Sequence, residues 1–136
     1  MASVNDIAEY ITMNFVDISY YKLQSLLFYS EIWHITSTNE ILFHSEFIKK
    51  DNGIFVKDFN CYLYDNFVMY DDIPNSHLEN IGKSQFIILN DVLTVYGDLS
   101  DNDLNYLVRN EIAYRHLDMG VSVNAMKLHT LYAIKS

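Results

Sequence analysis

The residues closest to a catalytic arrangement lie between Glu111 and Gly120. His116 and Asp118 are two positions apart in the segment RHLDMG, and Glu111 precedes them. Residues at positions i and i+2 do not share a helix face, so this spacing is poorly suited to an acid–base pair. A small hydrolase built on Glu111, His116 and Asp118 is therefore the least favoured hypothesis.

The remaining histidines and the single Cys61 do not form a recognisable ligand set. None of the histidines has the spacing of a helical zinc motif, and a lone cysteine can form neither an internal disulfide nor a paired-cysteine zinc site. The four glycines are dispersed and make no phosphate loop or nucleophile elbow. The dense carboxylates fit helix caps and loops, with a glycosidase pair as the alternative. We therefore expect no catalytic residue, no metal and no cofactor.

The composition indicates one folded domain spanning residues 1–136. Half of the residues are hydrophobic, 15% are aromatic and the formal net charge is −9. This charge disfavours direct binding to nucleic acid and to anionic membranes, both of which depend on clustered Lys and Arg. The N-terminus lacks the basic region of a signal peptide and no long apolar stretch follows, so we expect a cytoplasmic protein.

Tyrosine is the most abundant aromatic residue, with 11 copies. Tyrosine combines a large contact area with a polar tip and is enriched in interface hot spots. Since a small core cannot easily hide them all, part of this set is expected to form an aromatic binding face: Tyr20, Tyr21, Tyr62, Tyr64, Tyr70, Tyr106 and Tyr114.

The segment that must position these groups is a helix predicted over Ser19–Ile35. Its apolar residues occupy most of the helix circumference, which is typical of a buried central helix, and Ser19 is its expected N-cap. A shorter helix is predicted over Ser3–Phe15, with Ser3 and Asp6 as a capping box. The short link between the two favours an antiparallel pair.

A β-hairpin is predicted in the middle of the chain. Asn52-Gly53 separates the apolar pairs Phe47-Ile48 and Ile54–Val56, which favours a type I′ turn. Residues 41–43 are a further candidate strand. Residues 59–69 are compatible with either strand or helix.

Helices are predicted again in the second half. They cover Ser84–Tyr96 with Ser84 as N-cap and Gly97 as a left-handed C-terminal residue, then Asp101–Asn110 capped by Ser100, and finally Val121–Ile134. Residues 111–120 are expected to be irregular. The fold class is thus mainly α (α+β), a compact helical domain with a small central β-hairpin.

Three stretches resemble the Panacea antitoxin-domain family, the SocA/GepA-like phage-associated proteins. The first stretch, which is similar to the family's two opening helices, comprises VNDIAEYI followed by YYKLQSLLFYSEIWHI. The second stretch, EFIKKDNGIFVKDF, is similar to the family's GPV-containing segment. The third stretch, ILNDVLTVYGDLSDNDLNYLVRNE, is similar to its later helix pair. Matching positions in the last two stretches are Gly53, Val56, Tyr96, Gly97, Leu99, Ser100, Leu104 and Glu111. The chain departs from the family pattern at Ile54, Val108, Arg109 and Tyr114.

The resemblance implies a mainly helical, non-enzymatic domain that binds protein. Family members neutralise a toxin by direct contact or act as adaptors that pass it to a protease, and many are encoded by phages. We therefore expect an antitoxin-like module whose partner is a basic toxin, in keeping with the acidic charge. The expected partner-binding residues are Asn52, Gly53, Phe55, Glu111 and Tyr114. The alternative is a phage-encoded acidic anti-defence inhibitor or DNA mimic that binds a host nuclease or immune effector.

Overall fold

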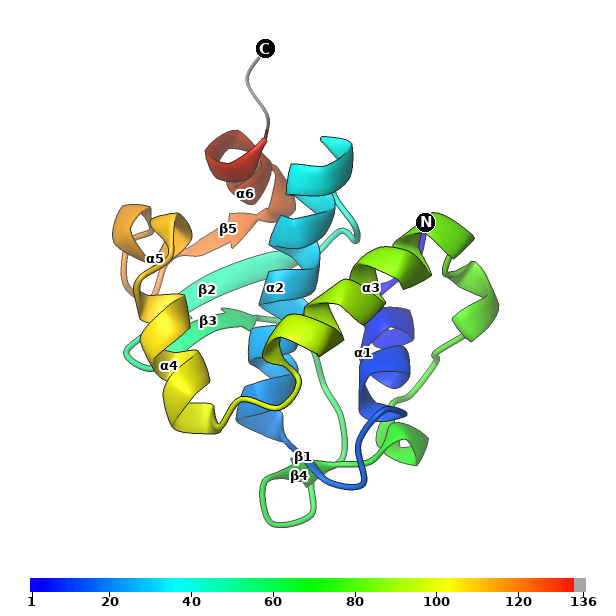
Figure 1. The fold of residues 1–136 in the computed structure, drawn as a ribbon. Helices are drawn as coiled ribbons and strands as arrows, with labels where there is room; N and C mark the ends of the chain where they lie inside the picture. The colour runs from blue at the N-terminus through cyan, green and yellow to red at the C-terminus, as the bar shows by residue number, and fades with distance from the viewer. Residues whose placement is uncertain (134–136) are drawn as a thin grey trace.

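Helix α2 (Tyr20–Thr38) runs through the centre of the molecule, and helices and strands pack around it (Figure 1). The structure is a computed structural model that describes residues 1–133. Twelve of the 19 residues of α2 are buried, as the apolar circumference predicts. Its predicted cap is confirmed, because the Ser19 hydroxyl accepts a hydrogen bond of 2.9 Å from the Lys22 N–H.

Helix α1 (Val4–Thr12) and helix α3 (Lys83–Tyr96) pack against one side of α2 (Figure 1). The predicted capping box of α1 is present, with Ser3 and Asp6 bonding to each other's backbone N–H. Helix α3 begins one residue earlier than predicted, after Gly82, so the assignment of Ser84 as N-cap is wrong. The Gln85 side chain caps this end instead, by accepting from the Gly82 N–H at 2.9 Å.

Gly97 ends α3 in a right-handed conformation, so the predicted left-handed cap is wrong. Its φ is −61°, and a Cβ at this position would lie 2.3 Å from the carbonyl oxygen of Leu93. Glycine is required here by the close approach of the preceding turn, not by a positive φ.

Three antiparallel strands form a sheet on another side of α2, in the order β3-β2-β5. Strands β2 (Glu46–Lys50) and β3 (Gly53–Val56) make the predicted hairpin, with Lys50 opposite Gly53. The turn residues are therefore Asp51 and Asn52, and neither has a positive φ, so the prediction of a type I′ turn is wrong. Contacts from outside the hairpin fix the turn, because the Asn52 carbonyl accepts from the Tyr21 hydroxyl at 2.6 Å and from Asn105 at 2.9 Å.

The third strand, β5 (Ser122–Asn124), occupies part of the region predicted as a helix over Val121–Ile134. It pairs with the outer edge of β2, a long-range contact that overrides the local helical pattern. Helix α6 (Ala125–Tyr132) follows, with the Asn124 side chain capping it through the Met126 N–H. Ile134 lies outside the described residues.

Residues 41–43 form a loop rather than the predicted strand. The buried carboxylate of Glu31 on α2 accepts hydrogen bonds from the backbone N–H groups of Leu42 and Phe43, which replaces strand pairing. In the ambiguous segment 59–69, only β4 (Phe67–Val68) is regular, and it pairs with β1 (Ile18–Ser19). Two single-turn helices, η1 (Tyr70–Asp72) and η2 (Leu78–Asn80), lead from there to α3.

Helix α4 (Asp101–Arg109) matches the prediction, and the Ser100 hydroxyl accepts from the Asp103 N–H. Helix α5 (Ile112–His116) was not predicted, since the charged sequence from 111 to 120 suggested an irregular segment. The fold class is confirmed as mainly helical α+β. Among the described helices none has the length and apolar character needed to cross a membrane.

Candidate functional site

The five predicted partner-binding residues fall in three different environments. Asn52 and Tyr114 lie at the tip of the hairpin, where α5 meets β2 and β3. Gly53 and Phe55 are buried, and Phe55 is only 8% exposed. Its ring packs edge-on against Tyr21, with the Lys50 ammonium 5.0 Å from the ring centroid. The expectation of an accessible Phe55 is therefore wrong, because the phenyl ring belongs to the packing between β3 and α2.

Tyr114 fastens α5 to the hairpin. Its hydroxyl donates to the carbonyl oxygens of Lys50 and Asp51, at 3.1 and 3.0 Å. The Lys49 ammonium lies 4.2 Å from the centroid of the same ring, within the range of a cation–π contact. Tyr114 thus holds a cation in place beside the hairpin tip.

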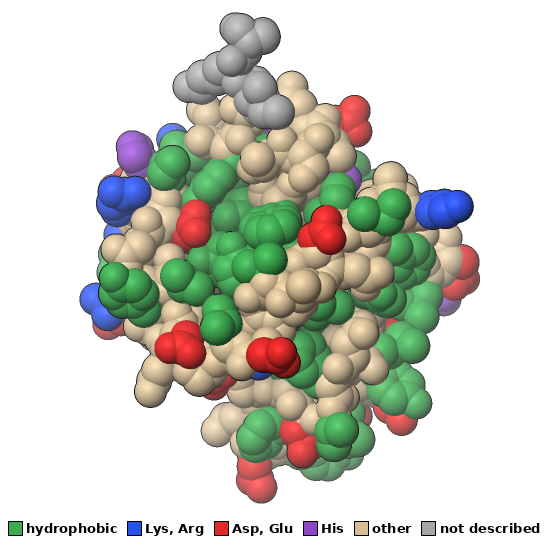
Figure 2. Space-filling view, viewed as in Figure 1, with side chains coloured by type: hydrophobic (Ala, Val, Ile, Leu, Met, Phe, Trp, Pro, Cys, Tyr) green, Lys and Arg blue, Asp and Glu red, His purple; other side chains and the backbone are tan. Residues whose placement is uncertain are grey.

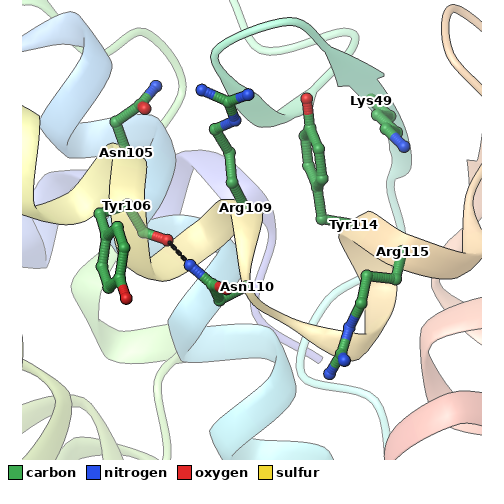
Figure 3. Close-up of a pocket in the computed structure, with 7 residues that line it drawn as sticks. All are labelled: Lys49, Asn105, Tyr106, Arg109, Asn110, Tyr114 and Arg115. Carbon is green, nitrogen blue, oxygen red and sulfur yellow. Dashed lines mark hydrogen bonds between the residues drawn. The ribbon is translucent and has the colours of Figure 1, made fainter.

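A cleft of about 510 Å³ opens beside Tyr114, and we call it the basic cleft. Figure 3 shows the Tyr114 ring between the side chains of Arg109 and Lys49, whereas the Arg115 side chain extends in the direction opposite to that of Arg109. The cleft holds three of the nine Lys and Arg residues of the chain and no carboxylate among its lining residues, which are Lys49, Asn105, Tyr106, Arg109, Asn110, Tyr114 and Arg115.

The cations of the basic cleft have no carboxylate partner within residues 1–133. The one ion pair in that part of the chain, at 3.6 Å, joins His77 and Glu79, far from the cleft in sequence. In the same residues the Lys49 ammonium donates one hydrogen bond, to the carbonyl of Leu117 at 3.3 Å. Arg109 and Arg115 are exposed, so their guanidinium groups are available for bidentate pairing with carboxylate or phosphate.

A second cavity, of about 380 Å³, lies between α2, α3 and α6, and we call it the aromatic cavity. Figure 2 shows hydrophobic surface gathered in the middle of the face that contains these helices, with isolated carboxylates around it. Four aromatic side chains and one carboxylate dominate its lining, which comprises Tyr29, Ile32, Trp33, Thr36, Ser37, Tyr96, Glu111 and Tyr132.

Glu111, a predicted partner-binding residue, lies in the aromatic cavity and not at the hairpin tip. Its two carboxylate oxygens accept hydrogen bonds from the hydroxyls of Tyr29 at 3.1 Å and Tyr132 at 2.9 Å. Burial raises the pKa of both tyrosines, and the negative charge of Glu111 raises the pKa further. Both hydroxyls therefore stay protonated and keep donating to the carboxylate.

The candidate catalytic residues are not assembled into a site. The His116 ring bonds to the Ile112 carbonyl at 2.9 Å, and no hydrogen bond joins Glu111, His116 and Asp118 in the described chain. Over the same residues, His, Cys, Asp and Glu form no group of three that could hold a metal ion. Burial, with the nearby charge of Asp72, raises the pKa of the Cys61 thiol to about 11, so this thiol is not activated.

The exposed tyrosines do not form one face. Tyr106 lies on α4 at the basic cleft and is 69% exposed. Tyr62, Tyr64 and Tyr70 are exposed in the segment around β4. The predicted aromatic face is thus divided between these two regions.

Sequence reasoning overlooked most residues that line the two cavities. A signal for the basic cleft was present, because Arg109 and Arg115 lie in one short segment of an acidic chain. The aromatic cavity has no local signal, since Tyr29, Tyr96 and Tyr132 come from three helices far apart in the sequence.

Comparison with protein-family models, curated proteins and solved structures found no match to this chain. The two cavities therefore supply the physical basis for the proposals below.

Proposed function

We propose that this chain is a non-enzymatic, antitoxin-like module that binds a partner protein at the basic cleft. The observation that carries the proposal is a concentration of positive charge on an acidic chain. Lys49, Arg109 and Arg115 surround one cleft whose lining contains no carboxylate from residues 1–133, although the formal net charge of the protein is −9.

The arrangement of these groups favours a protein over a small anion. The guanidinium groups of Arg109 and Arg115 extend to different sides of Tyr114 (Figure 3), so they do not converge on a single bound ion. Tyr106 adds a large exposed aromatic surface beside them. Arginine and tyrosine are the residue types enriched at interface hot spots.

The charges specify two features of the partner. The overall negative charge attracts a basic protein over long distances and accelerates encounter. The contact itself requires an acidic segment, because the cleft presents Arg109, Arg115 and Lys49. The proposed partner is therefore a basic toxin with an acidic segment that enters the basic cleft.

The family resemblance supports an antitoxin role for this surface. The basic cleft is built from β2, α4 and α5, and two of the resembling stretches contribute to it, residues 46–59 and 88–111. We propose that binding neutralises the toxin by direct contact, or passes it to a protease, in the cytoplasm of the host.

The decisive variant is Arg109→Gln combined with Arg115→Gln. Both residues are exposed, so the fold should be unaffected. The matched control, Lys57→Gln with Lys83→Gln, removes the same charge at exposed positions outside the cleft. The wild-type protein and both variants are used as tagged baits in the native host, at low and moderate salt, and any captured protein is then expressed alone and with each bait.

We expect the wild-type and control baits to capture one small basic protein that is toxic alone and harmless with the bait. The arginine variant should lose both capture and rescue. Equal rescue by the arginine variant would refute the basic cleft as the contact surface, and the absence of any stable partner would refute the proposal itself.

The inhibitor or DNA-mimic alternative predicts a different result in the same experiment. It requires carboxylates aligned like phosphates on one surface, whereas those on the face in Figure 2 are separated by other side chains. Capture of a host nuclease or immune effector, lost as salt rises, would favour this alternative over the antitoxin proposal.

A further inference from the structure

We infer that the aromatic cavity binds a small organic ammonium ion, with Glu111 as its counter-charge. This inference goes beyond the proposed partner binding, because it concerns a different cavity and a different ligand charge. It depends on the geometry of the aromatic walls and on the charge and hydrogen bonds of the Glu111 carboxylate.

The aromatic walls are fixed by contacts with one another. The rings of Tyr29 and Tyr96 stack with a centroid distance of 4.0 Å and an interplanar angle of 16°. Trp33 stands at 80° to Tyr96, with 5.8 Å between the ring centroids. The Trp33 indole N–H donates to the Tyr96 hydroxyl at 3.2 Å, which locks the angle between them. Tyr29 is buried beneath this stack, so the two rings at right angles that face the cavity are those of Trp33 and Tyr96.

The Glu111 carboxylate supplies a negative charge without a cationic partner. In residues 1–133 no Lys, Arg or His nitrogen lies within 4.0 Å of its oxygens. Among these described residues its hydrogen-bond donors are the neutral hydroxyls of Tyr29 and Tyr132, one to each oxygen. Each oxygen therefore retains accepting capacity for a further donor, and Glu111 lines the cavity.

This charge determines the class of ligand. A phosphate or carboxylate would be repelled by Glu111, and a neutral apolar molecule would remove water from the carboxylate without compensating its charge. An ammonium ion compensates the charge, and methyl groups on its nitrogen would contact the aromatic walls. A cavity of about 380 Å³ is within the usual range for small-ligand sites and accommodates such a group.

The chain provides its own optical probe, because Trp33 is the only tryptophan and lines the cavity. The full chain is titrated with choline and with its uncharged carbon analogue, in which a tert-butyl group replaces the trimethylammonium group. We expect choline to change the Trp33 fluorescence at concentrations at least about tenfold lower than the analogue does. Equal binding of the two ligands, or no binding of choline, would overturn the inference.

Glu111→Gln tests the counter-charge, with Glu46→Gln as a matched control at an exposed position outside the cavity. The Glu111 variant should bind choline at least about tenfold more weakly, while the control binds it as the wild type does. Unchanged choline binding in a folded Glu111 variant would also overturn the inference. If Glu111→Gln fails to fold, Tyr132→Phe serves as the second variant. It removes one hydroxyl donor but keeps the aromatic ring and the negative charge of Glu111, so it should still prefer choline over the uncharged analogue.

Two further titrations identify the source of the ligand and separate this site from the basic cleft. Tighter binding of acetylated trimethyl-lysine than of choline would indicate a methylated lysine side chain, and the reverse order a free ammonium compound. The Arg109→Gln, Arg115→Gln variant should bind choline like the wild type, so failure of either proposal leaves the other open to test.

Discussion

Glu31 makes the stability of this protein depend on pH in a way that can be calculated. The side chain lies on α2 with 0% exposure, and its carboxylate receives the backbone N–H groups of Leu42 and Phe43. Burial raises the pKa of Glu31 from 4.5 to about 7, against the opposing effect of the two N–H donors. The folded protein therefore keeps a proton that the unfolded chain releases.

The direction of the effect follows from proton binding. Between pH 4.5 and about 7 the folded state binds more protons at this site than the unfolded state, so the free energy of unfolding falls as pH rises. The contribution is complete below pH 4.5 and lost above about pH 7. The difference between the two pKa values corresponds to about 3 kcal/mol.

The assay is urea unfolding followed by Trp33 fluorescence at a series of pH values from about 5 to about 8. The ionisation of Glu31 should remove about 3 kcal/mol of the wild-type unfolding free energy over this range. Glu31→Gln keeps one acceptor oxygen but cannot ionise, so its stability should change far less. Because the other titrating groups are common to both proteins, the difference between the two curves isolates Glu31. Parallel curves would refute the assignment of a raised pKa to this carboxylate.

Three further perturbations have defined outcomes. Gly97→Ala would place a Cβ against the Leu93 carbonyl oxygen and should cost about 1–3 kcal/mol in urea unfolding; a loss of less than about 0.5 kcal/mol would contradict the steric role of Gly97. Gln24→Ala removes the side-chain oxygen that accepts from the Val56 N–H at 2.7 Å, which leaves this buried donor at the end of β3 without that partner. The variant should lose about 1–3 kcal/mol of unfolding free energy, observed as a lower midpoint of thermal unfolding, and an unchanged midpoint would contradict this expectation. Burial raises the pKa of Asp6, but its hydrogen bonds lower the pKa by more, so the net pKa lies below the ordinary value of 3.8. Wild-type stability should therefore fall as the pH drops below about 3.8, whereas Asp6→Asn should lose less stability over the same range. Acid titration followed by circular dichroism measures both.

Three of the helices predicted correctly, α1, α2 and α4, carry local signals at their N-termini. Ser3, Ser19 and Ser100 all cap the helices expected of them, because a cap depends on residues only two or three positions away. The two strands of the hairpin were predicted for the same reason. Local sequence is sufficient where the stabilising contacts are local.

The errors arise where distant contacts decide the local structure. Residues 122–124 have a helical pattern but form β5, because the edge of β2 offers backbone partners about 76 positions earlier. The turn at Asp51 and Asn52 is not type I′, and the Asn52 carbonyl accepts hydrogen bonds from Tyr21 and Asn105. Neither partner can be identified from the turn sequence.

The candidate site shows the same division. Asn52 and Tyr114 were predicted together and are indeed close in space, joined through the hairpin backbone. Glu111 was assigned to the same surface, yet its side chain lies in the aromatic cavity. Glu111 is the N-cap of α5 and Tyr114 lies in its first turn, so their side chains leave the backbone in different directions. The sequence alone does not determine these directions, because residues 111–120 were not predicted to be helical.

The hydrogen bonds of Glu111 also impose an order of assembly. The carboxylate joins Tyr29 to Tyr132, so one wall of the aromatic cavity is synthesised early and the other about a hundred residues later. The chain up to the end of α5 already contains Trp33, Tyr96 and Glu111 but not the Tyr132 wall on α6. Because translation proceeds from the N-terminus, Tyr132 is the last residue of the described cavity lining to be synthesised, and the second hydrogen bond of Glu111 becomes possible only then.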